Sequence, residues 1–161
     1  MGYTHSWRYH PGSTSYATTW LQIVQDANTI TANLPHRVRL AGPDRTGMPV
    51  LDSVAGITYN GAGDDGCDPF YLSPPGDDRG QWWFCKTDEQ PYDLAVTAML
   101  LRVHQLLPTT FLIGSNGDWA DDWRQARRLV QRLFGTPAQP SPLTDTSLGL
   151  TFEPGCFARP R

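Results

Sequence analysis

The sequence predicts an α+β domain, a mainly antiparallel sheet of about five strands with three helices packed on it. Three observations indicate this class. The amino-terminal segment alternates as a half-buried strand does, three later segments repeat apolar residues at helical spacing, and Gly, Pro and Asp cut the region between the first two helices into short apolar runs. The 161 residues suit one domain, so we expect a single domain over 1–135 with a proline-rich tail, 136–161, packed on it.

The first two elements come from the amino-terminal part of the chain. Residues 2–8 alternate, so we expect a strand that buries the face carrying Tyr3, His5 and Trp7. A helix is expected next, because hydroxyl residues able to cap its start precede apolar residues at helical spacing, and Pro35 ends the pattern.

The remaining elements are a meander, two helices and one further strand. The meander is expected from short apolar runs at 38–40, 50–51, 56–59, 70–72 and 81–86. Residues 92–107 are apolar nearly all round, which is typical of a helix buried against a sheet. A strand at 111–114 and an amphipathic helix at 119–134 follow, and the tail contains one strand-like run at 148–152.

Composition excludes several classes of protein. No run of about 18 apolar residues occurs and the first residues lack a hydrophobic signal core, so we expect a cytoplasmic protein with no membrane partner. The 3 cysteines form no Cys-x-x-Cys pair, which argues against a disulfide framework or a zinc site and favours a reducing compartment. With a net charge of -3, the chain lacks the positive field that duplex nucleic acid requires.

Aromatic residues suggest one candidate ligand pocket. Tyr3, His5 and Trp7 share a strand face, and the aromatic run 82–84 precedes the second predicted helix. Aromatic walls stack flat bases or sugar rings, and a neutral imidazole beside them adds one hydrogen bond. The alternative interpretation is that these rings form the core of the sheet and His5 is a buried, satisfied histidine.

The segment Cys85-Lys86-Thr87 suggests a second candidate. A strand end that leads into a helix start attracts anions, and Lys86 with Thr87 could complete a phosphate site. Alternatively, Thr87 caps the helix and Asp93 interacts favourably with its dipole. Cys85 could be a nucleophile beside a histidine, or a small buried hydrophobic residue.

An arginine stripe marks the third predicted helix. Arg124, Arg128 and Arg132 recur every four residues, with Arg127 alongside. Guanidinium groups bind oxyanions in bidentate fashion, so the stripe could bind a phosphate or an acidic protein partner. The alternative is the solvated face of an amphipathic helix.

Several short motifs resemble a known family. They are the opening Met-Gly-Tyr-Thr-His, the run 57–61, Phe-Cys-Lys-Thr at 84–87 leading to Pro-Tyr-Asp at 91–93, and Gly-Ser-Asn-Gly-Asp at 114–118. Together they resemble a family of small uncharacterised proteins of tailed phages and their bacterial hosts. The resemblance implies no activity, but the polar residues of these motifs are where we expect a ligand site.

These observations lead to a functional hypothesis with two alternatives. The leading hypothesis is non-enzymatic binding of a small nucleotide-like ligand, in a phage setting to sequester a host immune nucleotide signal, with no cofactor, no metal and no catalytic residue. The expected ligand-binding residues are Tyr3, His5, Trp7, Asn60, Lys86, Thr87, Tyr92 and Asp93.

The first alternative is an enzyme that processes nucleotide or ADP-ribose derivatives, with His5 as general base and Asp93 as its partner. The second is a protein–protein inhibitor that acts through the arginine-rich helix face. A homo-oligomer is compatible with each of these hypotheses.

Overall fold

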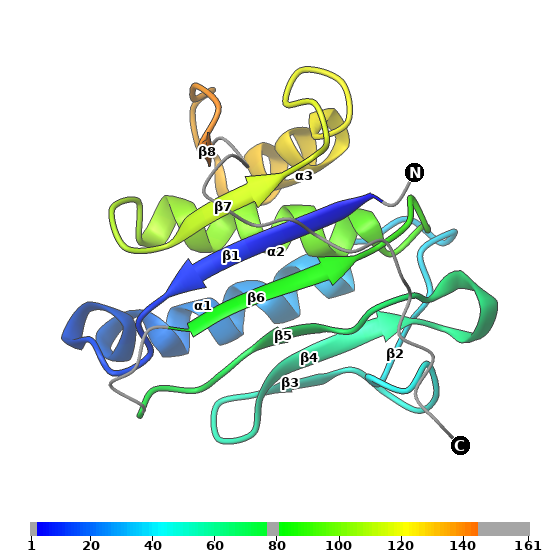
Figure 1. The fold of residues 1–161 in the computed structure, drawn as a ribbon, viewed down its shortest axis with the longest axis horizontal. Coiled ribbons are helices and arrows are strands. Elements are labelled where there is room, and N and C mark those ends of the chain that lie inside the picture. The colour runs from blue at the N-terminus through cyan, green and yellow to red at the C-terminus, as the bar shows by residue number, and fades with distance from the viewer. Residues whose placement is uncertain (1–2, 77–80, 145–161) are drawn as a thin grey trace.

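The amino-terminal strand lies inside a mixed sheet in the computed structural model, which describes residues 3–76 and 81–144. Within these residues the sheet has four strands, in the order β6 (Gln81–Lys86), β1 (Thr4–Tyr9), β7 (Leu112–Ser115) and β8 (Leu143–Thr144). β1 is antiparallel to both β6 and β7, and β8 runs parallel to β7. Figure 1 shows this sheet crossing the molecule in front of the helices.

The meander forms a second sheet. Its described strands are β2 (Leu40–Ala41), β3 (Val50–Asp52), β4 (Gly56–Gly61) and β5 (Phe70–Leu72), and the other three all pair antiparallel with β4. The predicted α+β class is confirmed, with the difference that the strands are divided between two sheets. The division arises because β6 leaves the meander and pairs with β1 along its whole length.

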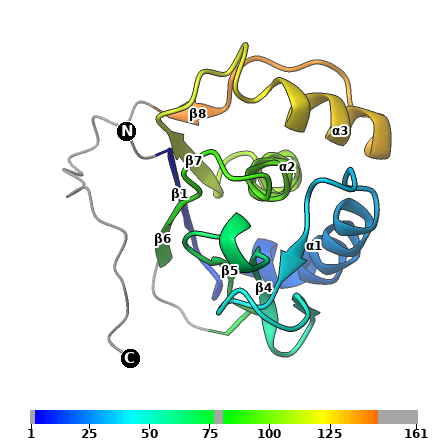
Figure 2. The same cartoon turned by 90° about the vertical axis from the view of Figure 1, so that its right-hand side faces the viewer.

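Three α-helices and one 3-10 turn complete the described residues: α1 (Thr14–Ala32), α2 (Asp93–Leu106), α3 (Arg124–Phe134) and η1 (Gly63–Asp65). Ser13 caps α1 by accepting a hydrogen bond from the Tyr16 N–H. α2 is buried on nearly all sides, as predicted, and Figure 2 shows it end-on between the first sheet and the other two helices.

α3 begins at Arg124 rather than at the predicted residue 119. Side chains before it compete for the backbone donors that a helix would use. The Asp122 carboxylate accepts the Asp118 N–H at 2.7 Å, and the Asp118 carboxylate accepts the Asp121 N–H at 2.9 Å. Residues 119–123 therefore form turns, and they place the Trp123 ring 5.4 Å from the ring of His5.

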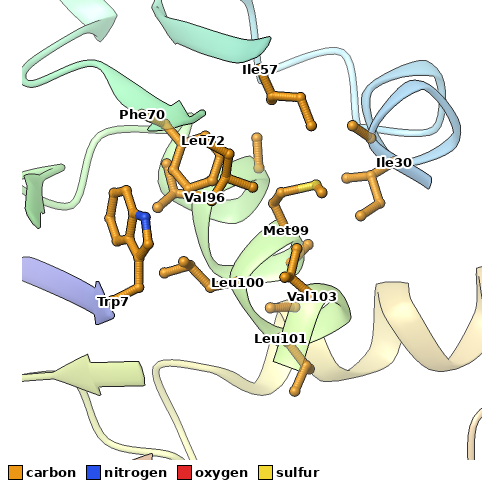
Figure 3. Packing of buried hydrophobic residues seen from close by; sticks show 14 of the residues in the cluster. Trp7, Ile30, Ile57, Phe70, Leu72, Val96, Met99, Leu100, Leu101 and Val103 are labelled. Atoms are coloured by element: carbon orange, nitrogen blue, oxygen red, sulfur yellow. The ribbon is translucent and has the colours of Figure 1, made fainter. Parts of the chain in front are cut away.

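The core lies between α2 and both sheets. In Figure 3 the side chains of Trp7, Phe70 and Met99 belong to one cluster, and the rings of Trp7 and Phe70 are 5.0 Å apart. β8 adds the start of the predicted tail to the first sheet, whereas the strand-like run at 148–152 lies outside the described residues. In the part of the chain that the structure describes, no helix is long and apolar enough to span a bilayer.

Candidate functional site

His5 is the centre of a hydrogen-bonded network where β1, β7 and α2 meet. Its side chain is fully buried. Nε2 lies 2.7 Å from Oδ1 of Asp93, the first residue of α2, and Nδ1 lies 2.9 Å from Oγ of Ser115, the last residue of β7. The predicted partnership of His5 with Asp93 therefore exists in the fold, and Ser115 adds a third member.

The surroundings of Ser115 fix the tautomer of His5. Its Oγ accepts the Gly117 N–H at 2.9 Å and the Trp123 Nε1–H at 3.2 Å. A hydroxyl oxygen has two lone pairs, so both are used and its own hydrogen is donated to Nδ1 of His5. Nε2 then carries a proton and donates it to Asp93.

Asp93 connects this network to the surface. Its Oδ1 accepts hydrogen bonds from both Nε2 of His5 and the Thr87 hydroxyl, the latter at 2.6 Å. Its Oδ2 makes no hydrogen bond within the described residues, and the side chain is 18% exposed. Asp93 lines a surface hollow of about 290 Å³. One carboxylate oxygen therefore has unused hydrogen-bonding capacity at an accessible place.

The hollow beside Asp93 is acidic. Glu89 and Asp122 also line it, and Arg37 and Gln125, which are hydrogen-bonded to each other, form part of the same lining. Glu89 and its neighbour Asp88 have positive φ angles of 59° and 54°. Two successive non-glycine residues in this left-handed region store backbone strain at the rim of the hollow.

A second hollow of about 340 Å³ adjoins the first and is basic. Arg128, Arg132 and Leu129 of α3 line it, and Leu94 and Gln125 line both hollows. We call the two hollows together the α2–α3 groove. The groove thus has three carboxylates and one guanidinium group, that of Arg37, at one end, two guanidinium groups at the other, and apolar side chains in its lining.

Tyr3 packs against the network without joining it. Its ring lies 4.9 Å from the ring of His5, edge to face, and its hydroxyl is buried with no hydrogen-bond partner within the described residues. Burial, and then the nearby carboxylates of Asp93 and Asp122, raise the pKa of this phenol. A Cβ atom at Gly117 would lie 2.1 Å from the hydroxyl oxygen, so only glycine permits this packing.

The structure brings together four of the predicted site residues, namely Tyr3, His5, Thr87 and Asp93, and separates the others from them. Trp7, expected to bind a ligand, is buried against Phe70 in the core and lines neither hollow. Asn60 is buried elsewhere: its amide donates to the carbonyls of Pro43 and Cys67, and its Oδ1 accepts the N–H groups of Gly61 and Cys67.

Tyr92 and Lys86 also lie apart from the groove. The Tyr92 hydroxyl donates to the Asp68 carbonyl at 2.7 Å inside the protein. The Lys86 N–H donates to the Asp68 carboxylate at 3.0 Å, and Lys86 is not among the residues that line either hollow. The phosphate site expected from Lys86 and Thr87 is therefore not assembled there.

Two alternatives from the sequence are also decided. Thr87 does not cap α2, because its hydroxyl donates to Asp93 and Tyr92 occupies the cap position. Cys85 is fully buried, and burial raises the pKa of its thiol well above the ordinary value, so it remains a protonated core residue.

Ser115, Asp122 and Gln125 belong to the site although the sequence did not single them out. Ser115 lies in the Gly-Ser-Asn-Gly-Asp motif, but its role depends on the long-range pairing of β7 with β1. Asp122 and Gln125 face the groove because α3 starts late. Among the described residues no group of three or more His, Cys, Asp or Glu side chains could hold a metal ion.

No family model, no curated protein and no solved structure matches this chain. The functional argument therefore depends on the geometry of the groove and the network beneath it.

Proposed function

We propose that the protein binds a small nucleotide-like ligand in the α2–α3 groove. The observation that carries this proposal is the division of charge, with the carboxylates of Glu89, Asp93 and Asp122 at one end and Arg128 and Arg132 at the other. A nucleotide has the matching division, because its base edge offers N–H donors and its phosphate is anionic. Leu94 and Leu129 provide the apolar surface that such pockets combine with a few polar groups.

The buried network favours binding over covalent chemistry. Ser115 is not a nucleophile, because Gly117 and Trp123 occupy both lone pairs of its oxygen. His5 is fully buried and cannot reach a ligand in the groove. The network holds Asp93 in one orientation, which lowers the entropic cost of using its free oxygen to bind a ligand.

The proposed setting is the cytoplasm of a bacterial host. The family resemblance supports a phage origin, in which a binder without catalysis would sequester a host immune nucleotide signal. The free thiol of Cys85 agrees with a reducing compartment.

Calorimetry with a panel of mononucleotides, dinucleotides and cyclic dinucleotides tests the proposal. Gln125→Trp fills the junction between the two hollows, and Gln131→Trp places the same side chain on α3 at a position that lines neither hollow. We expect at least one nucleotide to bind the native protein and Gln131→Trp equally, and to bind Gln125→Trp at least tenfold more weakly. Absence of heat with every nucleotide would refute the proposal.

One observation favours a second candidate, an enzyme that processes nucleotide or ADP-ribose derivatives. Asp93 has one oxygen held by His5 and the other open to the hollow, which is the arrangement of an oriented general base. In this candidate the roles predicted from the sequence are exchanged: Asp93 removes the proton and His5 positions it. Product formation from a bound nucleotide, abolished by Asp93→Asn while binding persists, would establish it.

A further inference from the structure

We infer that the ligand is a guanine nucleoside 5′-monophosphate or a close analogue, with its base at the acidic end of the α2–α3 groove and its phosphate at the arginine end. This inference rests on the proposed function. It goes further by naming the base, the direction in which the ligand lies and the residues that recognise each part.

The acidic end selects the base. Oδ2 of Asp93 and the carboxylate of Glu89 can only accept hydrogen bonds, so the ligand must present N–H donors. The Watson–Crick edge of guanine has two adjacent donors, N1–H and the N2 amino group, one for Oδ2 of Asp93 and one for a carboxylate oxygen of Glu89. Adenine and cytosine place a ring-nitrogen acceptor beside their amino group, and uracil flanks its single N–H with carbonyls. Each of these would set an acceptor against a carboxylate.

Gln125 supplies the complement to the guanine carbonyl. Its Oε1 accepts a hydrogen bond from the guanidinium of Arg37, which orients the amide with its NH₂ group as the remaining polar function. This NH₂ group makes no hydrogen bond within the described residues and belongs to a residue that lines both hollows. It is therefore available to donate to O6 of a guanine whose N–H edge faces Asp93.

The arginine end selects the phosphate. Arg128 and Arg132 follow Gln125 by three and seven residues on α3, which places them about 4.5 and 10 Å farther along the helix axis. This spacing is comparable with the distance from a base to its 5′-phosphate. Neither arginine forms an ion pair with a carboxylate within the described residues, whereas Arg124 on the same helix is paired with Asp121. The two unpaired guanidinium groups can bind one phosphate together.

Calorimetry with GMP, guanosine and AMP separates the two ends of the ligand. We expect GMP to bind about tenfold or more tightly than AMP, because adenine leaves a carboxylate facing an acceptor. Arg128→Gln and Arg132→Gln should each lower the affinity for GMP by about tenfold and leave the affinity for guanosine unchanged. Glu89→Gln should weaken GMP and guanosine by the same factor. Arg124→Gln is the matched control and should change neither affinity.

The outcomes distinguish this inference from the proposed function. If AMP or a pyrimidine nucleotide binds more tightly than GMP, and that binding is lost in Gln125→Trp, the guanine assignment fails while the function stands. If the arginine variants weaken guanosine as much as GMP, the assigned direction is wrong. If no nucleotide binds at all, both fail.

Discussion

Two polar clusters in the fold differ in the hydrogen-bonding capacity that they leave unused. In the closed cluster, the Asn60 side chain and the Tyr92 hydroxyl bind backbone groups of the loop around Cys67 and Asp68. In the open cluster, the chain of contacts from Trp123 through Ser115 and His5 ends on Asp93, one oxygen of which reaches the α2–α3 groove.

The difference shows that burial and residue type do not by themselves identify a functional residue. Asn60 is as buried as His5 and equally polar, yet both its donors and its acceptor oxygen are used by the surrounding backbone. Asp93 is distinguished by hydrogen-bonding capacity that remains unused at an accessible surface. The closed cluster should therefore determine stability, and the open cluster should determine both stability and binding.

The largest effect is expected for Asn60→Ala. The substitution leaves the carbonyls of Pro43 and Cys67 and the N–H groups of Gly61 and Cys67 without their side-chain partner, which should lower the free energy of unfolding by about 3–5 kcal/mol. Urea unfolding measures this loss. Asn28→Ala, at an exposed position of α1, is the control and should change stability by less than about 1 kcal/mol. Nucleotide affinity of the folded fraction should be unchanged; a loss of affinity would mean that the two clusters are coupled.

A smaller loss, about 2–4 kcal/mol, is expected for Ser115→Ala. The alanine leaves the Gly117 N–H, the Trp123 Nε1–H and Nδ1 of His5 without their hydrogen-bond partner. Combining it with His5→Phe in a double-mutant cycle should reveal a coupling energy of about 1 kcal/mol, because both residues belong to one network. Strict additivity of the two losses would contradict the network.

The sequence predicted the elements that depend on local pattern. Alternation in residues 2–8 identified β1 and its buried face, and the apolar content of residues 92–107 identified α2 and its central position. The start of α3 was wrong because Asp118 and Asp122 use their side chains to bind backbone N–H groups, a local competition that helical spacing does not reveal.

The sequence predicted only part of the site. His5 and Asp93 were expected to be partners and are hydrogen-bonded. Ser115 became part of the site through the register of β7 against β1, in which His5 faces Ser115, and this long-range pairing has no signature in the sequence. Asn60 and Tyr92 bind backbone groups of a loop away from the groove, and a polar residue in a motif has the same appearance in the sequence whether it binds a ligand or a loop.

A matched pair of substitutions, Tyr92→Phe and Tyr3→Phe, compares the two clusters directly. Tyr92→Phe leaves the Asp68 carbonyl with only the weaker Cys85 thiol as a donor, at 3.3 Å, and should cost about 1–2 kcal/mol. Tyr3→Phe removes a buried hydroxyl that has no partner, so stability should stay within about 0.5 kcal/mol or increase. Urea unfolding of both variants measures the difference. Equal losses would show that the Tyr3 hydroxyl has a partner in solution.

Alkaline pH should reduce the extra free energy of unfolding that the native protein has relative to Tyr92→Phe. Burial raises the pKa of its phenol above the ordinary value of 10.0, so the folded protein retains a proton that the unfolded chain releases. The resulting stabilisation is complete below pH 10 and declines as the pH rises further. From pH 10 to 11 the native protein should lose about 1 kcal/mol more than Tyr92→Phe in urea unfolding, because the other tyrosines contribute equally to both proteins. If the difference in free energy of unfolding between the native protein and Tyr92→Phe stayed constant from pH 10 to 11, the Tyr92 phenol would ionise in the folded state as it does in the unfolded chain.

The smallest effect concerns the strained rim of the groove and separates stability from binding. Asp88 and Glu89 both have left-handed φ angles, which glycine adopts without a steric cost, so Asp88→Gly and Glu89→Gly should each raise the free energy of unfolding by about 0.5 kcal/mol. Of these two residues Glu89 alone lines the hollow, so only Glu89→Gly should also lower the affinity for the nucleotide. Thermal unfolding and calorimetry on the same two proteins measure both quantities. If Asp88→Gly weakened the nucleotide equally, the loop conformation and not the Glu89 carboxylate would be the binding determinant.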